Sequence, residues 1–123
     1  MFLTVDFSSS VPLYLQLRNQ IVVGIAEGKL VPGERLPTIR ALAEESGINM
    51  MTVSKAYQIL RQEGYIVTDR RNGATVAAKN EVRVGPDTLR ELRLRLSELR
   101  LSGMSKTDIL ALCEKLYEEG DGK

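Results

Sequence analysis

Four basic residues of this sequence are candidates for binding an anion: Arg40, Lys55, Arg70 and Arg71. Guanidinium and ammonium groups bind phosphate oxygens through charge-assisted hydrogen bonds. The formal net charge is only +1, so general attraction to polyanions is weak and phosphate binding has to come from a local cluster. We therefore expect a local anion-binding surface, if the fold brings these four residues together.

Composition argues against other kinds of site. The sequence has no His, which excludes a His-dependent general base or triad, and its carboxylates show no metal-ligand spacing. Cys113 is the only cysteine, which we interpret as a small apolar packing residue. The N-terminus has no signal-peptide pattern, and no apolar run approaches the roughly 20 residues of a membrane span. We expect a cytoplasmic protein without enzymatic activity, metal, cofactor or membrane contact.

The elements that must position the cations are predominantly helical. Apolar residues at helical spacing predict a first helix over 12–27, with Ser10 as its N-cap. After a connector broken by two prolines and a glycine, two short helices are expected over 39–46 and 50–63. Their respective N-caps are Thr38 and Asn49, and Gly47 forms the turn between them. In this pair of helices and the turn between them, the residues expected to face the core are Ile39, Leu42, Ala43, Ile48, Val53, Ala56, Tyr57 and Leu60.

The spacing of Ala43 and Gly47 is typical of a helix-turn-helix, because a small residue allows close helix approach and glycine accepts a positive φ in the turn. Ser46 departs from the pattern, which usually has an apolar residue there. The spacing alone fits equally well a helical hairpin whose helices only pack together and do not bind DNA. A β-hairpin over 65–78, with Asn72-Gly73 as its turn signal and Arg70 and Arg71 at its tip, favours a winged helix-turn-helix that reads DNA.

The sequence also resembles a known family. The segments that carry the resemblance are Pro12-Leu13-Tyr14, Gly33-Glu34-Arg35-Leu36-Pro37-Thr38-Ile39-Arg40-Ala41-Leu42-Ala43, Gly47-Ile48-Asn49, Thr52-Val53, Ala56-Tyr57, Leu60 and Glu63-Gly64-Tyr65-Ile66. They are similar to the GntR family of bacterial regulators, and the short tail resembles its YtrA-like subfamily. The resemblance implies a transcription regulator, usually a repressor, that binds double-stranded DNA as a homodimer at an inverted-repeat operator. The residues placed at the DNA are Thr38, Arg40, Asn49, Met51, Thr52, Ser54, Lys55, Arg70, Arg71 and Gly73, with 50–63 as recognition helix and 65–78 as wing.

Several positions depart from the family pattern. Met50 stands where many members have Arg, and Ser54 stands near another usual basic position. Met51 cannot hydrogen-bond a base edge, although contact with a thymine methyl suits it. Arg71, Ala74 and Thr75 replace the usual wing residues. The operator sequence therefore does not transfer from the family.

Each proposed contact has a simpler interpretation. Arg40 and Lys55 also fit solvated helix charges, and Arg70 and Arg71 also fit ordinary turn residues. Thr52 also fits a packing role, and both methionines also fit exposed positions or contact with a partner protein.

The tail after a polar linker predicts two more helices, over about 86–102 and 106–119. They carry more leucine and isoleucine than two helices can cover alone, so we expect a second copy to bury the excess, although pairing within one chain is the simpler alternative. The expected dimer-interface residues are Leu89, Leu92, Leu96, Leu99, Ile109, Leu112 and Leu116.

The expected fold is mainly α with a small β-hairpin: a winged helix-turn-helix DNA-binding domain over 1–79, then a linker and two-helix dimerisation region over 80–123. A winged helix used only for protein assembly is a competing hypothesis, which the basic residues disfavour. A reader fused to an aminotransferase-like enzyme is another, and the sequence to Lys123 contains no such domain. A small-molecule effector is compatible with a regulator, but no residue identifies one.

Overall fold

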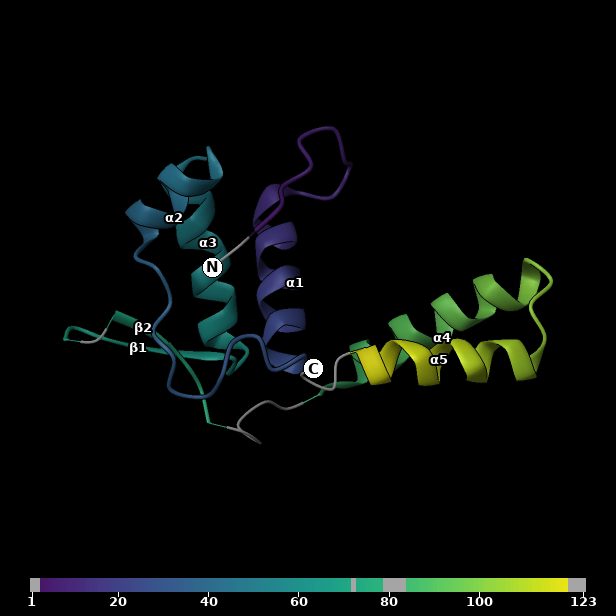
Figure 1. The fold of residues 1–123 in the computed structure, drawn as a ribbon. Helices are drawn as coiled ribbons and strands as arrows, with labels where there is room; N and C mark the ends of the chain where they lie inside the picture. Colours follow the sequence, from purple (N-terminus) through teal and green to yellow (C-terminus); the bar gives the residue numbers. More distant parts are fainter. Residues whose placement is uncertain (1–2, 72, 79–83, 120–123) are drawn as a thin grey trace. The chain divides into compact units, whose positions relative to one another are not determined.

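The computed structural model describes residues 3–71, 73–78 and 84–119 and divides the chain into two compact units, Met1–Val82 and Arg83–Lys123. The helices are α1 (Leu13–Ala26), α2 (Ile39–Ser46), α3 (Met50–Gln62), α4 (Pro86–Leu101) and α5 (Lys106–Glu119), and the strands are β1 (Ile66–Asp69) and β2 (Gly73–Val76) (Figure 1). The mainly helical fold with one antiparallel hairpin is the predicted one. The predicted domain boundary at 79–80 lies outside the described residues.

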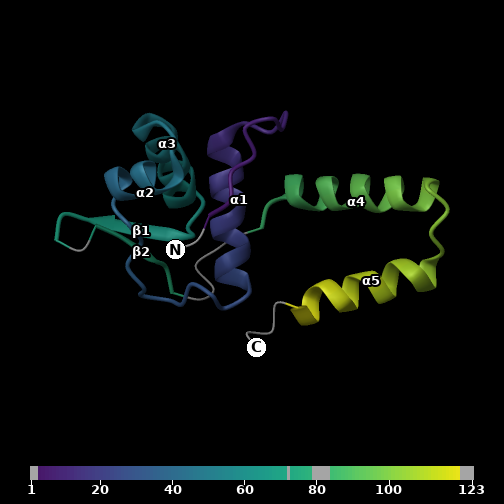
Figure 2. The same ribbon diagram turned by 45° about the horizontal axis from the view of Figure 1, so that its top comes forward.

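The first unit is a three-helix core with a hairpin at one end. Helix α1 packs beside α3, α2 contacts α3, and the β1–β2 hairpin continues from the C-terminal end of α3 (Figures 1 and 2). Buried hydrophobic side chains from every element of this unit form one cluster: Leu17, Ile21, Leu30, Leu36, Leu42, Ala43, Val53, Ala56, Tyr57, Leu60, Ile66, Ala74 and Val76. Ile39 and Ile48, expected in the core, are partly buried against it. This single core holds α2, α3 and the hairpin in one fixed arrangement.

The ends of the two short helices follow the sequence signals. The Thr38 hydroxyl accepts a hydrogen bond from the Ala41 N–H at 3.0 Å, and the Asn49 side chain accepts one from the Met51 N–H at 2.6 Å. Gly47 has a φ of 70°, the left-handed conformation that the turn requires. The predicted caps are therefore confirmed.

Three predicted boundaries need small corrections. Ser10 is not an N-cap, because Pro12 keeps an extended backbone with a ψ of 143° and occupies the cap position itself, so α1 begins at Leu13. The recognition helix ends at Gln62, where Glu63 is its C-cap. The hairpin is shorter than the expected 65–78, with strands at 66–69 and 73–76, and Asp69 pairs with Gly73 across the turn.

The connector before α2 has a role that the sequence did not suggest. Its backbone runs along the free edge of β2: Gly33 N–H donates to Val76 O at 2.8 Å, Val76 N–H to Glu34 O at 2.9 Å, and Leu36 N–H to Ala74 O at 2.8 Å. Arg35 and Thr75 form the corresponding β-bridge. Strand β2 is thus hydrogen-bonded on both of its edges, to β1 and to the connector, which restricts where the tip of the wing can lie.

Ser46, the residue that departs from the helix-turn-helix pattern, has a buried hydroxyl with no hydrogen-bond partner among the described residues. An unsatisfied buried hydroxyl costs about 1–3 kcal/mol. We expect Ser46→Ala to raise the free energy of unfolding by about 1 kcal/mol, and the melting temperature by about 4–8 °C. Urea and thermal unfolding measure this, with Ser54→Ala, an exposed serine on α3, as the control that changes little. A less stable Ser46→Ala protein would contradict the assignment.

The second unit is a helical hairpin, in which α4 and α5 contact each other after a short turn (Figure 2). The Ser105 hydroxyl accepts a hydrogen bond from the Asp108 N–H at 3.1 Å and so caps the start of α5. No described residue of either helix is fully buried. Every helix among the described residues is too short or too polar to cross a lipid bilayer.

Candidate nucleic-acid interface

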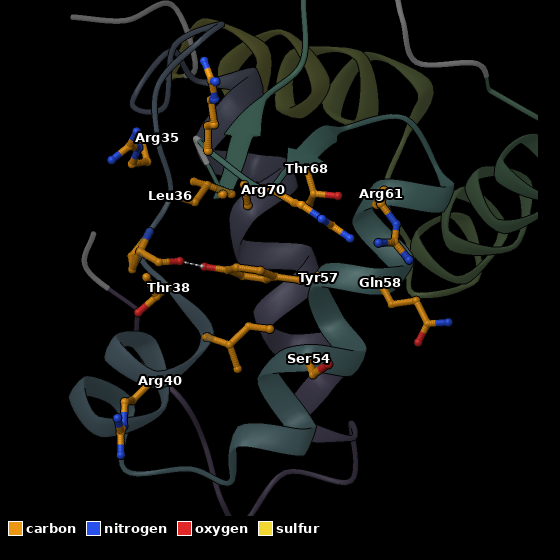
Figure 3. Close-up of a pocket in the computed structure, with 15 residues that line it drawn as sticks. Arg35, Leu36, Thr38, Arg40, Ser54, Tyr57, Gln58, Arg61, Thr68 and Arg70 are labelled. Atoms are coloured by element: carbon orange, nitrogen blue, oxygen red, sulfur yellow. Dashed lines mark hydrogen bonds between the residues drawn. The ribbon is translucent and has the colours of Figure 1, made fainter.

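A cavity of about 670 Å³ lies between the connector, α2, α3 and the wing (Figure 3). Five arginines line it, namely Arg35, Arg40, Arg61, Arg70 and Arg71, and none of its lining residues is acidic. Cations from four separate elements therefore surround one hollow. Such a concentration of positive charge suits a phosphate-bearing ligand.

Six of the predicted contact residues meet around this cavity. The set comprises Thr38, Arg40, Ser54, Arg70, Arg71 and Gly73. Arg40 is exposed on α2, and its nearest charged partner, Glu44, is 3.9 Å away, so the guanidinium keeps most of its hydrogen-bonding capacity. Arg70 and Arg71 are exposed in the β1–β2 turn, and Gly73, with a φ of 67°, has open space beside it. At Gly73 the backbone is bare enough for a ligand to approach closely.

The other four predicted residues lie outside the cavity. Asn49 caps α3, Met51 is exposed in its first turn, and Thr52 is half-buried. The Lys55 ammonium lies 4.0 Å from the centre of the Tyr14 ring, a cation–π contact with the first turn of α1. Lys55 is thus held on the side of α3 next to α1, separate from the arginine group at the wing.

Four polar residues of the cavity were not predicted from the sequence: Arg35, Gln58, Arg61 and Thr68. A sequence signal existed for two of them. Gln58 and Arg61 follow Ser54 by four and seven residues, the spacing that places side chains on one helix face. In Figure 3 the side chains of Arg61, from α3, and Arg70, from the wing, extend toward the same side of the cavity.

Tyr57 connects two walls of the cavity. Its side chain crosses from α3 to the connector, where the hydroxyl donates a hydrogen bond to the Pro37 carbonyl at 2.7 Å (Figure 3). Burial, and then the negative charge of Glu45, raise the pKa of this phenol well above its usual range. The neutral phenol is therefore part of the folded structure and fixes the distance between α3 and the start of α2.

We expect Tyr57→Phe to lower the free energy of unfolding by about 1 kcal/mol at neutral pH, because the Pro37 carbonyl loses its donor. The folded-state pKa is raised, so the contribution of the phenol is complete below its ordinary pKa of 10.0 and is lost as pH rises above it. Urea unfolding of both proteins at pH 7 and near pH 10.5 measures this: the advantage of the wild type should shrink at the higher pH. An advantage that grows with pH would contradict the arrangement.

Comparison with known proteins gives consistent matches. The family model described as bacterial regulatory proteins, gntR family, matches residues 13–76. The chain is 32% identical to the transcriptional regulator YhcF of Bacillus subtilis over 94% of this chain and 98% of YhcF. It is 33% identical to the transcriptional repressor YtrA of Bacillus subtilis, over 77% of this chain and 73% of YtrA.

Solved structures agree with these matches. A transcriptional antiterminator from Listeria monocytogenes has a TM-score of 0.81 and 30% identity, over 100% of this chain and 95% of that one. YtrA from Sulfolobus acidocaldarius, a GntR-family transcription factor, has a TM-score of 0.65 and 38% identity, over 80% and 99%. The AraR domain solved in complex with operator ORX1 has a TM-score of 0.56 and 28% identity, over 63% of this chain and 99% of that one.

Proposed function

This chain belongs to the gntR family of bacterial regulatory proteins, with YtrA-like relatives, and we propose that it represses transcription by binding an inverted-repeat operator as a homodimer. The class itself, a DNA-binding transcription regulator, follows from the family. The observation that carries the DNA contact in this proposal is the meeting of five arginines from the connector, α2, α3 and the wing around one cavity without acidic lining residues.

The arrangement suits duplex DNA in the following way. Helix α3 enters the major groove with its exposed face, on which Ser54 and Gln58 lie, and the wing approaches the neighbouring minor groove. The sugar-phosphate backbone between the two grooves then occupies the arginine-lined cavity. Arg40 and Arg70 bind phosphates on either side, and bare backbone at Gly73 allows the wing close to the strand.

Lys55 has a different place in this proposal. Because its ammonium is held against Tyr14, it contacts a phosphate at the end of the interface nearest α1 rather than in the cavity. Thr38 and Asn49 act mainly by fixing the first turns of α2 and α3, whose free N–H groups face the DNA.

The second unit supplies dimerisation, with residues 1–79 as DNA-binding domain and 80–123 as linker and dimerisation region. Leu96, Leu99, Ile109 and Leu112 are half-buried where α4 and α5 contact each other, whereas Leu89, Leu92 and Leu116 stay mostly exposed. A second copy buries these leucines and gives two readers related by two-fold symmetry, which requires an inverted repeat. Repression follows when this complex occupies a promoter in the cytoplasm, as the name of the related YtrA repressor suggests.

Selection from randomised duplex DNA with the full chain tests this function. We expect enrichment of an inverted repeat, and a mobility shift of the DNA upstream of its own gene if a copy of that repeat lies there. The same DNA with one half-site scrambled should bind at least tenfold more weakly. Enrichment of no sequence would contradict operator binding, and enrichment of direct repeats or single half-sites would contradict the two-fold dimer.

A further inference from the structure

Helix α3 presents an apolar residue at the head of an otherwise polar face. Met51, Ser54 and Gln58 follow one another by three and four residues, so they lie on one side of the helix. Ser54 and Gln58 line the arginine-rich cavity, and Met51 continues the same face by one turn toward the helix N-terminus. The Met51 side chain is 79% exposed and Met50 beside it is 50% exposed.

The exposure of Met51 is not a consequence of a poorly fixed helix end. Its N–H is bound by the Asn49 side chain at 2.6 Å, so the backbone that carries the thioether is held in place. Neither Met50 nor Met51 belongs to the hydrophobic core or to the residues packed against it. The first turn of α3 therefore offers a positioned apolar group directed away from the protein.

Residues at the N-terminal end of a recognition helix are those that reach base edges. Among the groups that base pairs present in the major groove, only the 5-methyl of a pyrimidine is apolar, and in unmodified DNA that base is thymine. A methionine side chain is flexible and polarizable, so it adapts its contact to a single methyl group. Because the methionine side chain has no N–H or O–H group, it cannot donate a hydrogen bond to a base.

We propose that Met51 reads the methyl group of one thymine in each half-site of the operator, which makes it a specificity-determining residue. This proposal rests on the proposed operator binding. It assigns Met51 a hydrophobic contact with DNA, at a position where Ser54 and Gln58 on the same face provide polar contacts.

Uracil substitution tests the proposal because uracil pairs like thymine but lacks the methyl group. The probe is the duplex enriched by selection, in which each thymine is replaced in turn by uracil. We expect one position in each half-site at which uracil weakens binding about fourfold, the effect of removing one buried methyl from an apolar contact. Met51→Ala should bind thymine and uracil equally at that position, and Met51→Leu should keep the preference.

One control variant and one measurement of folding show whether the effect is specific to Met51. Val23→Ala removes another exposed apolar side chain, 50% exposed against 79% for Met51, from α1, away from this face, and should keep the thymine preference. Thermal unfolding should show that Met51→Ala is folded, since its side chain leaves no cavity.

The outcomes separate the two proposals. If no sequence is enriched, operator binding itself fails. If a site is enriched but tolerates uracil everywhere, or if Met51→Ala keeps the same thymine preference, the assignment of Met51 is overturned. A second pyrimidine, 5-methylcytosine, carries the same methyl group. If a duplex with 5-methylcytosine at the uracil-sensitive position binds more tightly than the duplex with thymine there, the thymine assignment is overturned.

Discussion

Arg40→Ala is expected to weaken operator binding at least about tenfold, because one charge-assisted phosphate contact is lost in each protomer. The plot of log affinity against log salt should become less steep by about 2 for the dimer, since each lost phosphate contact contributes roughly one unit. Folding should be unaffected, because Arg40 is exposed and its only ion pair in the described structure, with Glu44, is long at 3.9 Å.

Three variants make the Arg40 result specific. Lys29→Ala removes an exposed cation that pairs with Glu27 on another part of the same unit, and should leave the salt dependence unchanged. Arg40→Lys keeps the charge without the planar fork and should fall between wild type and alanine. Glu44→Gln removes the competing carboxylate and should not weaken binding. Full-strength binding by Arg40→Ala with an unchanged salt dependence would show that Arg40 is only a solvated helix charge.

Leu89→Glu combined with Leu92→Glu is expected to convert the proposed dimer to a monomer and to weaken operator binding about a hundredfold. These leucines are 65% and 52% exposed in a single chain, so the substitutions should not unfold the monomer. In the proposed dimer they are buried, and four unpaired carboxylates at one interface oppose association. In a dimer, binding of one DNA-binding domain to its half-site places the second domain at a high effective concentration near the other half-site. A monomer loses this gain in affinity.

Sedimentation equilibrium and titration of a labelled operator measure the two effects. The matched control is Leu94→Glu combined with Leu101→Glu, which places the same charges on the opposite side of α4, where Leu101 is 88% exposed. This control should remain a dimer and bind normally. If it dissociates while the Leu89 and Leu92 variant stays dimeric, the interface lies on the other side of α4.

Most of the local structure was predictable from the sequence. Thr38, Gly47 and Asn49 mark the ends of α2 and α3 because caps and left-handed turns depend on the chemistry of one or two residues. Apolar spacing predicted helix α1 and the buried residues of α3 for a similar reason, since helical periodicity is a local property. Ser10 was wrongly taken as a cap because the extended conformation of Pro12 delays the helix start.

The positions of residues across elements were not predictable in this way. Arg35 and Arg61 are 26 residues apart, and only packing of the connector against β2 and of the hairpin against α3 brings both to one cavity. The cation–π contact of Lys55 with Tyr14 likewise joins residues from separate helices. Sequence periodicity contains no information on such distances, because it describes one element at a time.

The sequence by itself determined the elements, the caps at Thr38 and Asn49, and the cations at Arg40, Arg70 and Arg71. Tertiary structure decided that these three cations share one cavity with Arg35 and Arg61, whereas Lys55 is held apart by Tyr14. The physical reason is that a phosphate site depends on the summed field of charges a few ångströms apart. Only the common core of α1, α2, α3, the connector and the wing sets those separations.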